Sequence, residues 1–181
     1  MQPRKKHLVD TALTLFNQHG YHATGIDLIL AQSKVSKATL YKHFRSKDEL
    51  ILAALEQRNE QVLDMIKSKL ESALAANVPQ ELVIFDALNE WFNSDTFFGC
   101  NFINASAEYA DSEHPIHIYA AQHKKMVIEL VSTTLSTKDK CKADQISLLV
   151  EGAIVMAHTR GIKNAALTAK EMARLILEPT D

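Results

Sequence analysis

The segment from residue 35 to residue 47 combines hydroxyl groups, an aromatic ring and basic side chains at a spacing that suits contact with DNA. Cations bind phosphate oxygens and set the position of a protein on a duplex, whereas short polar groups can read the edges of the bases. The segment offers both kinds of group, with one further hydroxyl upstream. The candidate DNA-binding residues are Thr24, Ser36, Lys37, Ala38, Thr39, Tyr41, Lys42, His43 and Lys47.

Two short helices joined by a tight turn are predicted to position these side chains. Thr24 is a candidate N-cap for a first helix that ends near Gln32, because a hydroxyl can accept a hydrogen bond from a free N–H of the first turn. Ser36 is a candidate N-cap for a second helix over residues 37–43. The alternative interpretation is an ordinary pair of surface helices with solvated charges.

The apolar residues of the same segment predict which side faces inward. Leu40 and Phe44 are four residues apart and are expected to share the buried face of the second helix. Val35 is expected to anchor the turn from the same side. The hydroxyl and basic side chains are then left on the outward face, which is the arrangement that a recognition helix needs.

The run VSKATLYKHF at residues 35–44 resembles the DNA-binding domain of the tetracycline-repressor (TetR) family. Lys47 and Leu50 fit the same pattern, and the resemblance covers roughly residues 5–50. It implies a homodimeric transcriptional regulator, with repression as the expected direction, that binds an operator on double-stranded DNA and responds to a small-molecule effector. Earlier positions that match are Ala12, Leu15, Phe16, Gly20, Tyr21, Thr24 and Ile29.

Two positions depart from the family pattern, which commonly has glycine at each of them. Lys34 occupies the turn, where a left-handed residue other than glycine costs on the order of 1 kcal/mol. Ala38 adds a methyl group on the side expected to face DNA, where it can contact a thymine methyl. Both departures bear on which operator sequence is recognised.

Helical periodicity and few chain breakers predict an all-α fold of about nine helices. Five glycines and four prolines in 181 residues leave long uninterrupted segments, with no alternation typical of strands. Gly20 is expected to end the first helix, and Pro79 to begin the fifth. The expected helices cover residues 4–19, 24–32, 37–43, 47–76, 79–93, 100–109, 115–136, 142–160 and 165–177.

The distribution of charge divides the chain into two parts. Residues 1–50 hold eight Lys and Arg against four Asp and Glu, whereas residues 51–181 hold twelve against eighteen. A basic end on an acidic remainder orients a protein towards DNA. We therefore expect a helix-turn-helix domain over residues 1–47 and a ligand-binding and dimerisation domain over residues 48–181.

Composition indicates a cytoplasmic protein that does not enter a membrane. The hydrophobic fraction is 46%, and no apolar run approaches the roughly 20 residues that span a bilayer. The basic start leads into an amphipathic helix rather than the apolar segment of a signal peptide. Two cysteines, Cys100 and Cys141, are too few for a disulfide framework and are expected to be free thiols.

Residues 85–126 are rich in aromatic side chains interspersed with polar ones, which is the composition of a small-molecule pocket. The alternative is that these aromatic residues only fill a core. A body filled solid with side chains would then indicate a DNA-binding dimer that takes no effector. The candidate pocket residues are Trp91, Phe98, Asn101, Asn104, Glu108 and His117.

The last two expected helices carry small and aliphatic residues on broad faces. Two such helices from each of two subunits can form a four-helix interface, as the resemblance implies, and such a dimer would read a palindromic operator. The alternative is packing within one chain. The candidate dimer residues are Leu149, Ala153, Ile154, Ala157, Ala169, Met172 and Ile176.

An enzyme is the rival class, namely a metal-dependent or cysteine-dependent helical hydrolase built on Cys100 or on the histidines His114 and His117 with Glu108. The sequence contains no Ser/His/Asp order, no glycine-rich phosphate loop and no complete metal-ligand spacing. We therefore assign no catalytic residue, metal or cofactor. A sensing role for Cys100 or for the two histidines stays open.

Overall fold

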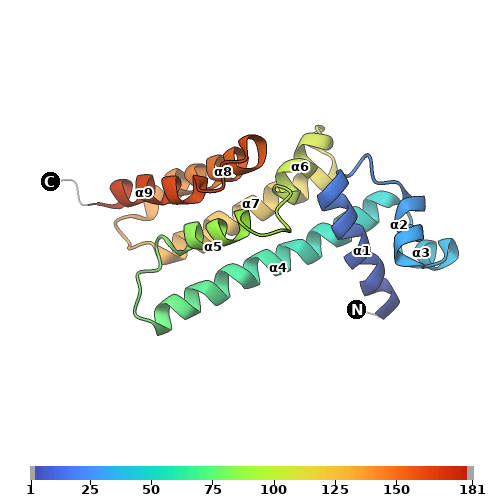
Figure 1. Cartoon of the computed structure of the whole chain (residues 1–181), viewed down its shortest axis with the longest axis horizontal. Coiled ribbons are helices and arrows are strands. Elements are labelled where there is room, and N and C mark those ends of the chain that lie inside the picture. The colour runs from blue at the N-terminus through green and yellow to red at the C-terminus, as the bar shows by residue number, and fades with distance from the viewer. Residues whose placement is uncertain (1–2, 179–181) are drawn as a thin grey trace. The chain divides into compact units, whose positions relative to one another are not determined.

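The computed structural model describes residues 3–178, and this range contains nine α-helices, one short 3-10 turn and no strand. The predicted all-helical fold is confirmed (Figure 1). The helices are α1 (Pro3–His19), α2 (Ile26–Ser33), α3 (Lys37–His43), α4 (Lys47–Ala75), α5 (Val83–Phe92), α6 (Asn101–Glu108), α7 (Pro115–Thr134), α8 (Ala143–Arg160) and α9 (Ala165–Leu177).

The described residues form two compact units. The first unit comprises residues 3–61 and 100–124, and the second comprises residues 62–99 and 125–178. Helices α4 and α7 run through both units, and the chain also passes from one unit to the other between residues 99 and 100. The first unit therefore holds α6 and the start of α7 in addition to the three helices of the expected 1–47 domain.

The core of the first unit forms where α1 packs against α2 and α3. Phe16 and Tyr21 are fully buried and stack with ring centroids 5.2 Å apart. Gly20 ends α1 as predicted, with a left-handed φ of 85° and its N–H bonded to the Phe16 carbonyl. The Tyr21 hydroxyl donates to the carbonyl of Asn101 at 3.0 Å, which ties α6 into this core.

The second unit is built on contacts among α5, α8 and α9. The expectation that Pro79 begins the fifth helix is wrong, because α5 begins at Val83. The Gln80 side chain donates to the Leu70 carbonyl at 2.8 Å, and the Val83 N–H bonds to the Gln80 carbonyl. These bonds hold a turn where a first helical turn was expected. No helix within residues 3–178 is long and apolar enough to cross a bilayer.

Candidate DNA-binding surface and effector region

Helix α3 has the predicted bounds and the predicted cap. The Ser36 hydroxyl accepts a hydrogen bond from the Thr39 N–H at 3.2 Å, which satisfies a donor that the helix itself cannot pair. Leu40 is fully buried and fixes the inward face. Phe44 is also buried, but it lies just beyond the helix in an extended conformation.

The polar face of α3 is turned to solvent, as the predicted role requires. Tyr41 is 47% exposed although its ring is large and largely apolar. Thr39 and His43 are half-buried and line a hollow of about 420 Å³ together with Lys42 and the start of α1. The candidates classed as exposed are Ser36, Lys37, Ala38, Tyr41 and Lys42.

The turn between α2 and α3 places a lysine in the left-handed region. Lys34 has φ 55° and ψ 24°, so the position usually given to glycine keeps its conformation without one. The Ser33 hydroxyl accepts from the Val35 N–H at 3.3 Å. His7 of α1 lies 3.0 Å from the Ser33 carbonyl through Nε2, a contact that sequence analysis missed.

Thr24 does not cap α2, so that part of the prediction is wrong. The N-cap residue is Gly25, and the Thr24 side chain is fully buried. Its hydroxyl donates to the carbonyl of Gly20 at 2.7 Å and lies 3.3 Å from that of Leu15. Thr24 therefore holds the α1–α2 loop against α1 through hydrogen bonds. Its hydroxyl is buried and does not face solvent, where DNA would bind.

Lys47 lies at the start of α4 and is half-buried. Its ammonium donates to the carbonyl of His22 at 3.3 Å. Burial lowers the pKa of Lys47, and the carboxylates of Glu108 and Asp48 act in the opposite direction. The lysine therefore contributes to the packing of the first unit in addition to its expected contact with phosphate.

The six candidate pocket residues are divided between the two units. Trp91 and Phe98 belong to the second unit, where Trp91 packs edge-on against Phe97 with ring centroids 4.9 Å apart. In the first unit, the carboxylate of Glu108 accepts from backbone N–H groups of the α1–α2 loop, and Nδ1 of His117 lies 2.7 Å from the Tyr109 carbonyl. Glu108 and His117 are thus engaged in holding the first unit together.

Asn101 differs from the other candidates because it is buried with an unmet hydrogen-bonding group. Its side chain is 3% exposed, and its Nδ2 has no partner among the described residues. Buried amide groups in folded proteins are normally paired. The Asn101 amide therefore lacks a hydrogen-bond acceptor for its Nδ2.

A buried polar pair and a thiol contact lie in the same unit. Nδ1 of His123 is 2.7 Å from Oδ1 of Asn59, and its ring stacks on Phe102 at 3.5 Å. Burial lowers the pKa of His123 to about 3, assisted by the positive charges of Lys124 and Arg58. The Lys124 ammonium is 3.5 Å from Sγ of Cys100, so the thiol has a basic neighbour that lies far from it in sequence.

The histidines considered as metal ligands are engaged separately. His114 Nε2 lies 3.6 Å from a carboxylate oxygen of Asp48, whereas His117 contacts a backbone carbonyl. Within residues 3–178, no group of three or more His, Cys, Asp or Glu side chains is arranged to hold a metal ion.

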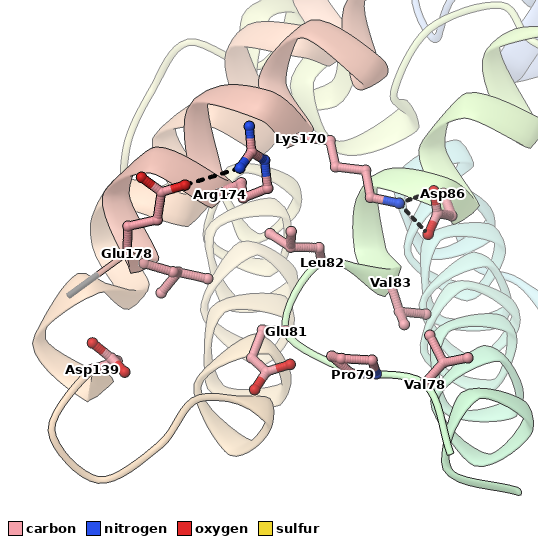
Figure 2. Close-up of a pocket in the computed structure, with 11 residues that line it drawn as sticks. Val78, Pro79, Glu81, Leu82, Val83, Asp86, Asp139, Lys170, Arg174 and Glu178 are labelled. Atoms are coloured by element: carbon pink, nitrogen blue, oxygen red, sulfur yellow. Dashed lines mark hydrogen bonds and ion pairs between the residues drawn. The ribbon is translucent and has the colours of Figure 1, made fainter. Parts of the chain in front are cut away.

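The second unit contains a groove of about 490 Å³ that sequence analysis did not find (Figure 2). Val78, Pro79 and Leu82 contribute apolar surface to it, and two ion pairs lie beside it. Lys170 binds Asp86 at 2.6 Å, and Arg174 binds Glu178 at 2.9 Å. The groove is separate from every residue proposed for the pocket.

Most of the candidate dimer residues are covered by their own chain. Ala153, Ile154, Ala157 and Ala169 are buried inside the second unit, Leu149 and Ile176 are half-buried, and Met172 is 50% exposed. The four buried candidates therefore have little surface left for a partner subunit, whereas Met172 is open to one. The large apolar residues exposed on α8 and α9 are Leu148, Val155, Met156, Leu167, Met172 and Leu175.

Comparisons with known proteins agree with this description. A sequence model of the bacterial regulatory proteins of the tetR family matches residues 8–54. The regulator YjdC of Escherichia coli is 26% identical over 156 residues, which cover 83% of this chain and 81% of YjdC. The crystal structure of SCO4454, a TetR-family transcriptional regulator from Streptomyces coelicolor, aligns with a TM-score of 0.84 and 28% identity over 98% of this chain and 90% of SCO4454.

Other relatives match half of the chain or less. The transcriptional activator FasR of Mycolicibacterium smegmatis is 38% identical over 69 residues, which cover 38% of this chain and 32% of FasR. The chain spans only about a third of the length of FasR and of two other curated relatives.

A capped recognition helix with an exposed basic face, on an all-helical scaffold, defines a DNA-binding transcriptional regulator of the helix-turn-helix class. Residues 8–54 match the DNA-binding domain of the tetR family, and over nearly its whole length the chain is similar to a TetR-family regulator. The proteins that the chain resembles are transcriptional regulators, which favours a regulator over the hydrolase alternative.

Proposed function

We propose that this protein is a repressor that binds a palindromic operator as a homodimer and leaves the operator when a small-molecule effector binds. The observation that carries the proposal is the solvent-facing side of α3, where Tyr41 and Lys42 are exposed while Leu40 is buried. This face offers phosphate-binding cations and groups that can reach base edges.

The homodimer is supported by the apolar face that α8 and α9 leave exposed. Leu148 is 74% exposed and Leu175 is 62% exposed, and contiguous exposed apolar surface marks interaction sites. A palindrome has two half-sites and needs two recognition helices, so the proposed partner is a second copy of the chain. Two-fold symmetry then places the recognition helices roughly 34–36 Å apart or somewhat further, on two half-sites of a palindrome.

An effector contact is proposed at Asn101, since its buried Nδ2 lacks an acceptor among the described residues. The effector would carry a carbonyl, carboxylate or other acceptor atom that this amide can reach. The competing proposal is a DNA-binding dimer without an effector, in which Asn101 has no ligand to bind.

Selection of bound duplexes from a random pool tests the DNA part of the proposal. We expect enrichment of one palindromic sequence, bound with a stoichiometry of two chains per duplex in analytical ultracentrifugation. Failure of the full chain to enrich any sequence would overturn the assignment of a specific operator.

A screen for compounds that release the enriched duplex tests the effector part. The variant Asn101→Leu, which keeps the branched shape of the side chain and removes the amide, should bind the operator normally but respond at least about tenfold more weakly to a releasing compound. If no compound releases the duplex, the form without an effector is favoured. An unchanged response of Asn101→Leu would remove Asn101 from the site.

A further inference from the structure

The α1–α2 loop, residues 20–25, is held by a carboxylate from a distant part of the sequence. Glu108, in the last turn of α6, accepts a hydrogen bond from the Tyr21 N–H at 2.8 Å and from the His22 N–H at 2.6 Å. Its two oxygens each take one of these donors. Hydrogen bonds to a charged acceptor are roughly twice as strong as bonds between neutral groups.

Further contacts fix His22 from two sides. Its Nε2 lies 2.9 Å from the Glu108 carbonyl, and its ring lies 4.8 Å from the ring of Tyr109. The ammonium of Lys47, at the start of α4, donates to the His22 carbonyl at 3.3 Å. The loop is therefore bound by both α6 and α4 at one residue.

Gly20 provides the room that the carboxylate occupies. A Cβ atom at this position would lie 2.8 Å from Oε1 of Glu108, which is closer than real Cβ contacts. The other end of the loop is fastened by Thr24, whose hydroxyl donates to the Gly20 carbonyl at 2.7 Å. Helix α2 begins two residues after Thr24, so the loop has little freedom to change the direction in which α2 starts.

We infer that Glu108 is a positioning residue for DNA recognition. Its carboxylate fixes the α1–α2 loop and thereby the orientation of α2 and α3, so a displacement of α6 would be transmitted to the DNA-reading face. The inference rests on the proposed function, since it explains how a signal received outside the helix-turn-helix can reach α3. A role in packing alone would leave DNA selectivity unaffected by changes at this residue.

The chemistry of the carboxylate makes the inference testable with a conservative variant. Two N–H donors need two acceptor atoms, and a glutamine offers one acceptor and one NH₂ donor. Glu108→Gln therefore keeps the size of the side chain and leaves one of the two N–H groups without a partner. Glu108→Ala removes both bonds. Glu113→Gln, at an exposed glutamate of the same unit, is the matched control for the loss of charge.

Amide hydrogen exchange measured by NMR reports the two bonds directly. In Glu108→Ala, the amides of Tyr21 and His22 should exchange at least about tenfold faster, with a smaller increase in Glu108→Gln. Glu113→Gln should match the wild-type chain. Unchanged exchange at both amides in both Glu108 variants would overturn the inference.

Binding to two duplexes separates positioning from general stability. In Glu108→Gln we expect about tenfold weaker binding to the operator found by selection, and binding to a shuffled duplex within about twofold of wild type. Equal losses on both duplexes, or no loss on either, would contradict the inference while leaving the proposed function intact. Failure of the wild-type chain to prefer the operator would instead count against the proposed function.

Discussion

The helix-turn-helix and the α8–α9 pair are both pairs of helices joined by a short connection, yet they expose opposite kinds of side chain. Helix α3 buries Leu40 and exposes a lysine and a tyrosine next to it. Helices α8 and α9 bury alanines and expose leucines, of which Leu148 and Leu175 are the most exposed. One surface suits an anionic duplex, and the other suits an apolar partner.

This difference shows which faces of a helix can be predicted from sequence. On α3 the contrast between apolar and polar residues is strong, so one leucine is enough to indicate the inward face. On α8 and α9 both faces are apolar, and the sequence alone does not decide between the alanine face and the leucine face. Packing decides it, because small residues let two helices approach closely and the larger ones are then left outside.

The largest effect is expected from a charge placed on the exposed α9 face. Leu175→Glu would bury an unpaired carboxylate from each subunit in a two-fold interface, which should raise the dimer dissociation constant on the order of 100-fold or more. Sedimentation velocity over a concentration series measures this change.

Leu74→Glu is the matched control, since Leu74 is similarly exposed at 68% but lies on α4. It should sediment like the wild-type chain. Ala169→Glu sharpens the comparison further, because Ala169 is buried within the unit and its change should unfold the chain. A dimeric Leu175→Glu chain would count against the α8–α9 interface.

The next largest effect is expected on the α3 face. Tyr41→Ala and Lys42→Ala should each weaken operator binding by roughly tenfold to a hundredfold and leave the dimer intact, because both side chains are exposed and away from the core. Fluorescence anisotropy over a salt series measures affinity and charge contacts together. Lys125→Ala, at an exposed lysine of α7, is the control. Wild-type affinity and salt dependence in both variants would remove α3 as the recognition helix.

Lys47→Ala tests DNA binding through a lysine of α4 that is expected to contact phosphate. It should weaken binding to all duplexes by similar factors and reduce the salt slope by about 1. The loss of its bond to the His22 carbonyl should add a small decrease in stability. A loss confined to the operator would instead indicate that Lys47 acts on sequence recognition.

The sequence predicted the local features and missed those that depend on distant contacts. Ser36 as a cap and Gly20 as a helix end depend on neighbouring residues, so the pattern showed them in advance. Thr24 has the chemistry of a cap, but the carbonyls of α1 lie close enough to take its hydroxyl. Glu108 was predicted for a pocket, and only the fold shows that it lies beside Tyr21.

The first unit buries a side chain that can titrate, His123, so its stability should depend on pH. The pKa of His123 is lowered by burial from 6.5 to about 3, so the folded chain holds the ring neutral. The unfolded chain binds a proton below its ordinary pKa, which favours unfolding. Stability from this group is therefore present above pH 6.5 and is lost as the pH falls towards 3, by up to about 1.4 kcal/mol per pH unit.

Urea unfolding at pH 7.5 and pH 5.5 measures this loss. His123→Phe keeps an aromatic ring against Phe102 and removes the titrating group. The variant should be less stable at pH 7.5, because the hydrogen bond between His123 and Asn59 is lost, and should lose less stability on acidification than the wild-type chain. An equal pH dependence in the two chains would show that His123 is not held neutral.

The smallest effect is expected at the turn that precedes α3. Lys34 holds φ 55° and ψ 24°, a conformation in which a side chain crowds the backbone and glycine does not. Lys34→Gly removes that crowding but gives the unfolded chain more freedom, so the net gain in the free energy of unfolding should be only about 0.5–1 kcal/mol.

Asn77, with φ 56°, offers the matched control, because asparagine tolerates this region better than lysine. Asn77→Gly should change stability by less than Lys34→Gly in the same urea titrations. If Lys34→Gly is no more stable than the wild-type chain, then the lysine is not strained, and the departure from the family's glycine concerns DNA contact instead of folding.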